Sequence, residues 1–263
     1  MPPLFRRGQR LSYCKLGLMS LKDHFEQRKV GATPSSFRSL IPLLTPSGPQ
    51  WTESELESEL LEQLAFSPGV YDLMTQPVIR YLHNGKQRRY TPDIAVQLYG
   101  EIAGFPSRYL IEVKRKADLA AKADKYASKF EIARICCDQL GASFRIMTED
   151  QIRTPYLRNA RQYLRFRNIH LRDDHIQKLD IVQSILKEHP HSVYDLTSVL
   201  QQRGLPEPEA RDLVALAIGS QSVSCDFSIP IQDDTTLSVH RDPDAVTRHN
   251  TPILFTLLNA DSR

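Results

Sequence analysis

The 263-residue sequence lacks long hydrophobic runs. No stretch approaches the roughly 18 consecutive apolar residues that a membrane span needs. The first 20 residues also lack the continuous apolar core and small-residue cleavage site of a signal peptide. We therefore expect a cytoplasmic protein that has no contact with a membrane.

Cysteine is scarce, and its spacing argues against a zinc site. The four cysteines are Cys14, Cys136, Cys137 and Cys225, and none of them has the spacing typical of zinc ligands. The eight histidines form no pair with metal-binding spacing either. Free thiols in a reducing compartment are expected, rather than disulfides or a zinc knuckle.

Glycine-rich phosphate-binding loops are missing as well. The 11 glycines form no Walker-type motif, so any dependence on ATP would have to come from a partner. Serine, histidine and aspartate residues form no recognisable nucleophile elbow, which argues against a serine hydrolase.

Acidic residues are absent from one basic segment. The net charge of +3 is only mildly basic, but residues 151–172 contain six arginines and no acid. On a helix, Arg158, Arg161 and Arg165 recur at steps of three and four residues and form one basic stripe. This stripe is expected either to lie along DNA phosphates or, with equal weight, to be a solvated helix face over an apolar core.

Changes in composition predict three parts. Residues 1–50 are rich in proline, serine and basic residues, and we expect an extended arm or cover with weak local structure. Residues 51–172 are predicted to form the main domain, and residues 173–263 a second one. The basic residues near the N-terminus are Arg6, Arg7, Arg10 and Lys15.

Helical and strand patterns follow one another in the main domain. The expected elements, in order, are an amphipathic helix over 52–66 with Thr52 as its N-cap, a strand region over 70–82, a turn at Asn84 and Gly85, a hairpin partner over 87–99, a third strand over 108–116, a long alanine-rich helix over 117–141 and a strand over 143–148. A strand, a long helix and another strand are typical of a parallel crossover.

Charged residues stand at the ends of two of these strands. Asp93 begins the apolar part of the hairpin's second strand, and Glu112 and Lys114 end the third strand. Because side chains alternate between the faces of a strand, Glu112 and Lys114 share one face, while Ile111 and Val113 point into the core. The two acids and the lysine are therefore expected to converge.

Two acids and a lysine suit metal-dependent hydrolysis of a phosphodiester. Carboxylate oxygens are ligands that Mg²⁺ prefers, and Mn²⁺ is the alternative ion. The lysine would orient or help to deprotonate the attacking water and offset charge in the transition state. A second ion would need another acid, for which Glu57 on the preceding helix is the candidate and Glu53, one turn earlier, the alternative.

The same charges have a simpler interpretation. Glu112 and Lys114 would then be the polar end of a surface hairpin with solvated side chains. Against this interpretation, Asp93 and Glu112 stand directly beside apolar strand residues, where an unpaired acid would be costly.

Residues beyond 173 predict a helical domain with the element order of a winged helix. Three short amphipathic helices are expected over 174–190, 192–204 and 207–221, followed by two strand-like segments over 222–229 and 235–241. The third helix begins with Glu207, Glu209 and Asp212, whereas a helix that reads DNA presents Arg, Lys, Asn or Gln. We therefore expect this domain to bind a protein, with DNA as the second choice.

Several of these motifs, in order, resemble a known nuclease family. Glu57, the "TPD" at Thr91 to Asp93 and the "EVK" at Glu112 to Lys114 are similar to the PD-(D/E)xK restriction-endonuclease fold. Over roughly residues 33–170 the sequence more closely resembles TnsA, the endonuclease subunit of heteromeric transposases. The further matching pieces are "TPSSFRS", "SELE", "GVYDLMTQP", "LIEVK" and "FRIMTEDQIR".

This resemblance implies a fold, an activity and partners. The fold would be an α/β restriction-endonuclease-like core, a mixed sheet flanked by helices, with a C-terminal winged-helix-like domain that contacts a TnsC-like AAA+ ATPase. The activity would be a cut in the 5′ strand at transposon ends, made together with a TnsB-like transposase that cuts and joins the 3′ ends. Glu57, Asp93 and Glu112 would bind one or two metal ions, and Lys114 would be the catalytic lysine.

Two other functions remain open. A stand-alone restriction or repair nuclease of the same fold would cut DNA without partners. A non-catalytic DNA-binding assembly factor would carry a degenerate site, although the presence of all the site residues argues against degeneracy. No element has the pattern of a base-reading helix, so we expect a partner to supply specificity for the DNA end.

Overall fold

The computed structural model describes residues 19–28, 38–83, 85–100, 106–239 and 246–260. The basic N-terminal residues Arg6, Arg7, Arg10 and Lys15 lie outside the described residues, as do Cys14 and the turn residue Asn84. Within the described ranges, each helix is too short or too polar to span a bilayer.

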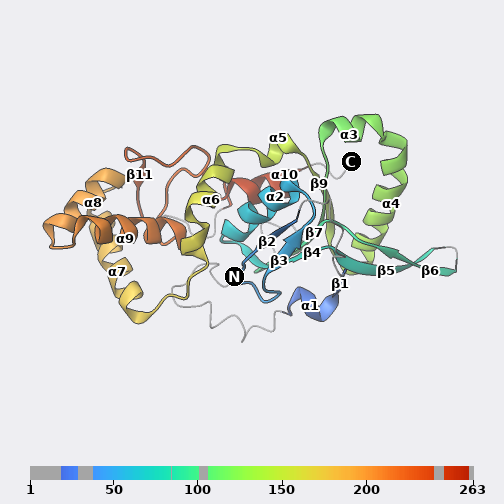
Figure 1. The fold of residues 1–263 in the computed structure, drawn as a ribbon, viewed down its shortest axis with the longest axis horizontal. Coiled ribbons are helices and arrows are strands. Elements are labelled where there is room, and N and C mark those ends of the chain that lie inside the picture. The colour runs from blue at the N-terminus through green and yellow to red at the C-terminus, as the bar shows by residue number, and fades with distance from the viewer. Residues whose placement is uncertain (1–18, 29–37, 84, 101–105, 240–245, 261–263) are drawn as a thin grey trace.

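A four-stranded sheet forms the centre of the N-terminal part (Figure 1). Its strands, in spatial order, are β4 (Val70–Thr75), β7 (Ile94–Leu98), β8 (Arg108–Val113) and β9 (Ser143–Met147). β7 runs antiparallel to both β4 and β8, and β9 runs parallel to β8. The predicted parallel crossover is therefore confirmed.

The crossover between β8 and β9 is helical but interrupted. The single long helix expected there is divided at Lys122 into α3 (Lys116–Ala121) and α4 (Ala123–Leu140), because the backbone of Lys122 leaves the helical conformation with φ −129°. Gly141 ends α4 in the left-handed conformation, with φ 59°, which glycine adopts readily.

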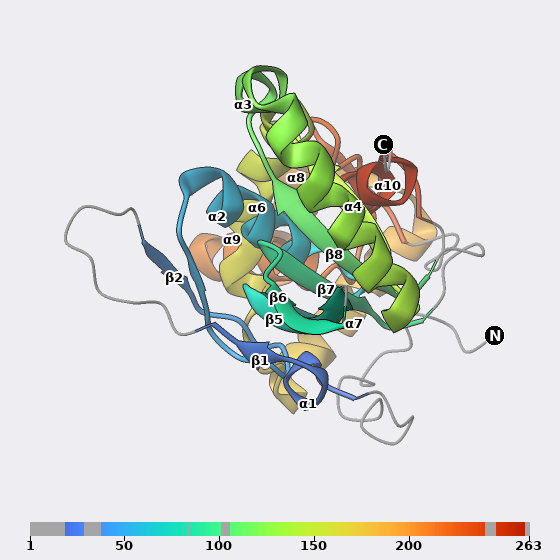
Figure 2. The same cartoon turned by 90° about the vertical axis from the view of Figure 1, so that its right-hand side faces the viewer.

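Helices cover both faces of the sheet (Figure 2). On one face, α2 (Glu55–Phe66) and α6 (Pro155–Arg167) pack in an apolar cluster with Leu73 and Ile111 of the strands. On the other face, α4 packs in a separate cluster with Leu110. Helices on both faces of a mixed sheet give the expected α/β class.

The start of α2 differs by two residues from the sequence prediction. Ser54, and not Thr52, is the N-cap, because its hydroxyl accepts a hydrogen bond from the backbone N–H of Glu57 at 3.2 Å. Thr52 is the last residue of β3 (Gln50–Thr52). The apolar stripe of Leu56, Leu60 and Leu64 is buried, as predicted.

Each of the two expected hairpin strands is divided by a bend. Gln76, with φ 50°, separates β4 from β5 (Pro77–His83), and residues 91–93 separate β6 (Lys86–Tyr90) from β7. The two bends are joined, since the N–H of Gln76 donates to the carbonyl of Asp93 at 2.9 Å. Strands β5 and β6 therefore pair with each other outside the central sheet, and the short β1 (Glu26–Gln27) pairs with β5.

The described part of the N-terminal 50 residues is more structured than the sequence indicates. It contains α1 (Leu21–His24), β1 and β2 (Ser39–Ile41), which pairs with β3. The carboxylate of Asp72 on β4 is fully buried and accepts hydrogen bonds from the N–H of Leu21 at 2.7 Å and the N–H of Ser47 at 2.9 Å. A single buried acid thus connects two N-terminal segments to the central sheet.

The three helices expected in the C-terminal part are present. They are α7 (Asp173–Glu188), α8 (Val193–Gln202) and α9 (Glu207–Gly219). β10 (His191–Ser192) pairs with β11 (Thr236–Leu237) in antiparallel fashion. The strand expected over 222–229 is reduced to one bridge between Ser224 and Ser238, so the assignment as a winged helix stays a prediction.

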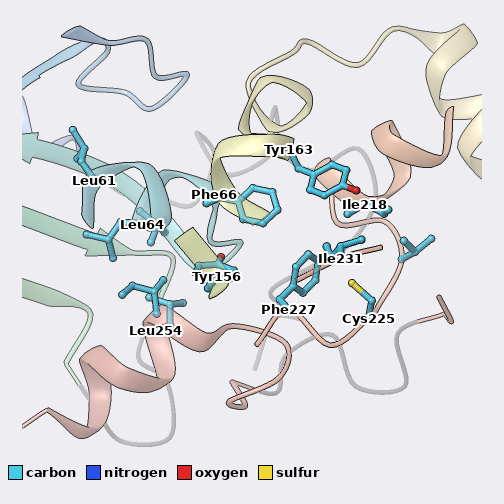
Figure 3. Close-up of a cluster of buried hydrophobic side chains, with 14 of the residues drawn as sticks. Leu61, Leu64, Phe66, Tyr156, Tyr163, Ile218, Cys225, Phe227, Ile231 and Leu254 are labelled. Carbon is cyan, nitrogen blue, oxygen red and sulfur yellow. The ribbon is translucent and has the colours of Figure 1, made fainter. Parts of the chain in front are cut away.

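One hydrophobic core connects the N-terminal and C-terminal parts (Figure 3). The ring of Phe66, at the end of α2, lies 5.7 Å from the rings of both Tyr156 on α6 and Phe227 in the C-terminal part. Helix α10 (Pro252–Asn259) returns to this core through Leu254. The boundary predicted at residue 172 thus lies beside a core to which both parts contribute.

Helices α6 and α9 approach each other closely in this core. A Cβ atom placed on Gly219 would lie 2.4 Å from Cβ of Phe166 and 2.9 Å from the carbonyl oxygen of Tyr163. Such distances are below any van der Waals contact, so the crossing requires glycine. The close crossing ties the C-terminal helices firmly to the sheet-covering helix α6.

Candidate active site

The two acids and the lysine singled out in the sequence lie together at one end of the central sheet. Asp93 directly precedes β7, Glu112 is near the end of β8, and Lys114 follows that strand. Nζ of Lys114 lies 2.8 Å from Oδ2 of Asp93 and 2.9 Å from Oε2 of Glu112. The structure thus brings these three side chains to a common point, while their role in catalysis stays a prediction.

The bends in the two hairpin strands hold Asp93 in place. Its backbone N–H donates to the carbonyl of Ile111 at 3.0 Å, and its own carbonyl accepts from Gln76. Its carboxylate accepts a further hydrogen bond from the N–H of Val113 at 2.7 Å. The side chain is therefore fixed by backbone groups of the neighbouring strand, and 14% of it remains exposed.

Glu112 is completely buried but fully bonded. Oε1 accepts a hydrogen bond from the hydroxyl of Tyr90 at 2.8 Å and lies 2.8 Å from Nζ of Lys129 on α4. Oε2 is held by Lys114. Two cations and a phenol therefore compensate the cost of burying this charge.

Sequence patterns did not reveal Tyr90 and Lys129. Tyr90 ends β6 three residues before Asp93, a position at which an aromatic side chain is equally expected to pack in a core. Lys129 is one of two lysines on α4, and nothing in the local sequence separates it from the exposed Lys125. Its contact with Glu112 depends on how α4 docks on the sheet.

The two acids differ in their ionisation. Burial and the charge of Glu112 raise the pKa of Asp93 to about 7, against the opposing effect of Lys114. Burial alone would also raise the pKa of Glu112, but the charges of Lys114 and Lys129 hold it below its ordinary value. Glu112 is thus the member of the pair that stays charged at neutral pH, whereas the raised pKa of Asp93 favours its protonated form more than usual.

The lysine between the acids stays protonated. Burial acts to lower the pKa of Lys114, but the charges of Asp93 and Glu112 outweigh burial and raise it above its ordinary value. In this arrangement the lysine is a donor of hydrogen bonds and positive charge.

Glu57 and Glu53 lie at the start of α2 in different environments. The carboxylate of Glu57 accepts hydrogen bonds from the hydroxyl of Ser54 at 2.8 Å and from the N–H of Glu53 at 3.1 Å. Its charge contributes to the raised pKa of Asp93. The carboxylate of Glu53 instead pairs with Arg28 and accepts from Nε2 of Gln76.

The residues at this site fit a hard divalent cation. Carboxylate oxygens of Asp93 and Glu112 both point toward the position of one ammonium group, so an ion replacing that ammonium would meet two oxygen ligands. In the part of the chain that the structure describes, no group of three or more His, Cys, Asp and Glu side chains is arranged to hold a metal. This set suits Mg²⁺, which keeps several waters and needs only one or two carboxylates.

The arginine stripe lies on α6, which packs on the opposite face of the sheet from α4. Arg158, Arg161 and Arg165 are all exposed. Nε of Arg161 lies 2.8 Å from a carboxylate oxygen of Glu62 on α2, and the guanidinium of Arg165 lies over the ring of Phe166 at 4.6 Å. At least one of the three thus links two helices, and contact of the stripe with phosphates stays a prediction.

Replacing Lys129 with methionine is expected to lower the melting temperature at neutral pH. Because the positive charge of Lys129 helps to hold the pKa of Glu112 down, this acid contributes stability above its ordinary pKa of 4.5 and loses that contribution as the pH falls further. The difference between wild type and Lys129→Met should therefore shrink below about pH 4.5. Thermal unfolding measured from pH 3 to pH 8 tests this.

Lys125→Met, on an exposed position of the same helix, is the matched control and should change the melting temperature little at any pH. A Lys129→Met difference that is constant over the whole pH range would contradict the role assigned to Lys129.

Comparison with known families gives a match to part of the chain. Residues 67–149 match the family described as TnsA-like endonuclease N terminal. A search of the curated proteins found no significant match. The matched segment runs from the end of α2 to the start of α5 (Glu149–Ile152) and includes Asp93, Glu112 and Lys114. Over this segment, which is about a third of the chain, the protein is similar to the TnsA-like endonuclease family.

Proposed function

We propose that this protein is a metal-dependent DNA endonuclease and the subunit of a transposase that cuts the 5′ strand at transposon ends. The observation that carries this proposal is the convergence of Asp93, Glu112 and Lys114 on one point, inside the segment that matches the TnsA-like family. Two acids and a lysine are residue types that suit metal-dependent hydrolysis of a phosphodiester.

Each side chain has a distinct part in this proposal. Asp93 and Glu112 hold Mg²⁺ or Mn²⁺, which when bound polarises the phosphate and makes a water more acidic. Lys114 orients the attacking water and offsets negative charge on the phosphate. Tyr90 and Lys129 keep the carboxylate of Glu112 in its position. Glu57 is the proposed acid for a second ion.

Partners complete the proposed assembly. A TnsB-like transposase would cut and join the 3′ strands and supply recognition of the transposon end. A TnsC-like AAA+ ATPase would bind the C-terminal part, which we propose to be winged-helix-like. In support, the start of α9 exposes Glu207, Glu209 and Asp212, and Arg211 is paired with Glu207 at 3.1 Å. Such an acidic helix end repels DNA and favours a basic protein surface.

The test is cleavage of end-labelled transposon-end DNA with Mg²⁺ in a buffer at neutral pH, with and without the partner subunits. Asp93→Asn should reduce the 5′-strand cut by about 100-fold or more, because one metal ligand is lost. The matched control is Asp118→Asn on α3, where the side chain is 41% exposed and pairs with Lys122; this variant should cut like wild type.

The other outcomes separate the alternatives. A cut without any partner would identify a stand-alone nuclease. Assembly on DNA without a cut in any divalent ion would identify a non-catalytic assembly factor. Full cutting by Asp93→Asn would show that the chemistry takes place elsewhere in the chain.

A further inference from the structure

The hairpin of β5 and β6 extends away from the central sheet (right-hand side of Figure 1). Its strands are paired from Ile79 and Tyr90 at the base to His83 and Lys86 near the turn. Gly85, with φ 71°, allows the tight reversal between them. The hairpin is thus a two-stranded ribbon whose outer half is exposed on β6 from Lys86 to Arg89.

The charge of this ribbon has one sign. From Pro77 to Tyr90 the chain carries no acid and four basic residues, Arg80, Lys86, Arg88 and Arg89. Arg80 pairs with Glu26 of β1 at 2.8 Å. Lys86, Arg88 and Arg89 are exposed and form no ion pair with the residues that the structure describes. Three cations are therefore left without compensating charge on the ribbon.

One face of the ribbon leads directly to the candidate active site. The hydroxyl of Tyr90, at the base of β6, donates to Glu112. Because side chains alternate along a strand, Arg88 and Lys86 share the face of Tyr90, at about 7 and 13 Å along the strand. The cations are thus spaced about two nucleotides apart, given a rise of about 3.4 Å per nucleotide.

An exposed apolar side chain accompanies these cations. Leu82 on β5 is 73% exposed and lies opposite Gln87. Charges on an edge strand can also serve to prevent pairing with other sheets. Charges of either sign would prevent such pairing, however, whereas the charges here are all positive. An exposed leucine on the same ribbon would also favour pairing with another sheet and not prevent it.

We propose that the β5–β6 hairpin is a DNA-binding arm that lies in a groove of the duplex beside the cut. It contacts phosphates through Lys86 and Arg88 on the face that Tyr90 shares, and through Arg89 on the opposite face. A two-stranded ribbon has the width that the major groove accepts. Contacts to phosphates place the duplex without reading its sequence. This inference rests on the proposed nuclease function, since it places DNA beside the candidate active site, to which Tyr90 connects the hairpin.

The test is binding of the full-length protein to a fluorescent duplex over a series of salt concentrations, without divalent ions. The variant carries Lys86→Ala, Arg88→Ala and Arg89→Ala. The logarithm of the association constant falls linearly as the logarithm of the salt concentration rises. Loss of three phosphate contacts should make this slope less steep by about 2 to 3 and weaken binding at least about tenfold at moderate salt. The matched control removes three exposed cations elsewhere, with Lys178→Ala, Lys187→Ala and Arg203→Ala, and should keep the slope of wild type.

Each outcome of this binding experiment supports or overturns the proposed DNA-binding arm. An unchanged slope in the hairpin variant would overturn the arm and indicate that the hairpin contacts a protein instead. Equal losses in the variant and the control would show general electrostatic attraction and would also overturn it. A hairpin-dependent slope with no cutting under any condition would support the arm and refute the nuclease, so the two proposals fail separately.

Discussion

Replacing Lys114 with methionine is expected to reduce strand cutting by about 1,000-fold while leaving the fold intact. Methionine keeps the length of the apolar side chain but removes the ammonium that lies 2.8 Å from Asp93 and 2.9 Å from Glu112. The charge that would orient water and offset negative charge on the phosphate is then missing. The measurement is the single-turnover rate of 5′-strand cleavage with saturating Mg²⁺ and partner subunits.

The same substitution should not weaken binding of the metal ion. In wild type the ammonium of Lys114 occupies the point on which the two carboxylates converge, so an ion bound there, as proposed, would have to displace it. Removing this competitor should leave the affinity for Mn²⁺ unchanged or increase it, as measured by calorimetry on the uncomplexed protein. If Lys114→Met lost both ion binding and cutting, Lys114 would be shown to position the acids and to have no part in the chemistry.

The control is a neighbouring lysine on the same segment. Lys116→Met removes a cation that is 61% exposed and pairs with Asp150, away from the two acids. It should cut at nearly the wild-type rate. Lys114→Met activity within tenfold of wild type would contradict the catalytic role.

Replacing Asp72 with alanine is expected to lower the free energy of unfolding by about 3–5 kcal/mol. Its buried carboxylate accepts from the backbone N–H groups of Leu21, Ser47 and Leu73, and from two serine hydroxyls. Without it, these donors are left buried and unsatisfied. Denaturant unfolding monitored by circular dichroism tests this, and the melting temperature should fall by about 10 °C.

The loss should be greatest where the N-terminal segments meet the sheet. Limited proteolysis of Asp72→Ala should cut first near Ser20 or Ser47, since both lose their contact with β4. Asp212→Ala removes an exposed acid on α9 and should change stability by less than about 0.5 kcal/mol. Unfolding of Asp72→Ala at the wild-type denaturant midpoint would refute the structural role of this acid.

Local sequence patterns predicted the elements of the central sheet better than their connections. The period of two in the third strand placed Ile111 and Val113 in the core and Glu112 beside Lys114, and the structure has this arrangement. The same patterns missed the bends at Gln76 and before Asp93. These bends depend on pairing between strands that are distant in sequence, since the N–H of Gln76 bonds to Asp93.

For the candidate site, too, the sequence predicted some of the residues and missed others. The sequence predicted that Asp93, Glu112 and Lys114 lie close together, because all three stand at the ends of strands, where the geometry of a short motif is fixed. Tyr90 and Lys129 do not, because their contacts with Glu112 arise from docking of the hairpin and of α4. A sequence pattern also gave no indication that Glu112 is fully buried, since burial depends on the helix that covers the sheet.

The core shared by Phe66, Tyr156 and Phe227 determines how force would travel through the molecule. Over the described residues, the C-terminal helices join the sheet through continuous packing, and α9 lies against α6 at Gly219 with no space for a side chain between them. Because this packing is continuous, a force on α9 would be transmitted through α6 to the central sheet that carries the two carboxylates. If the proposed partner binds α9, it would therefore influence the position of the candidate site without contacting that site.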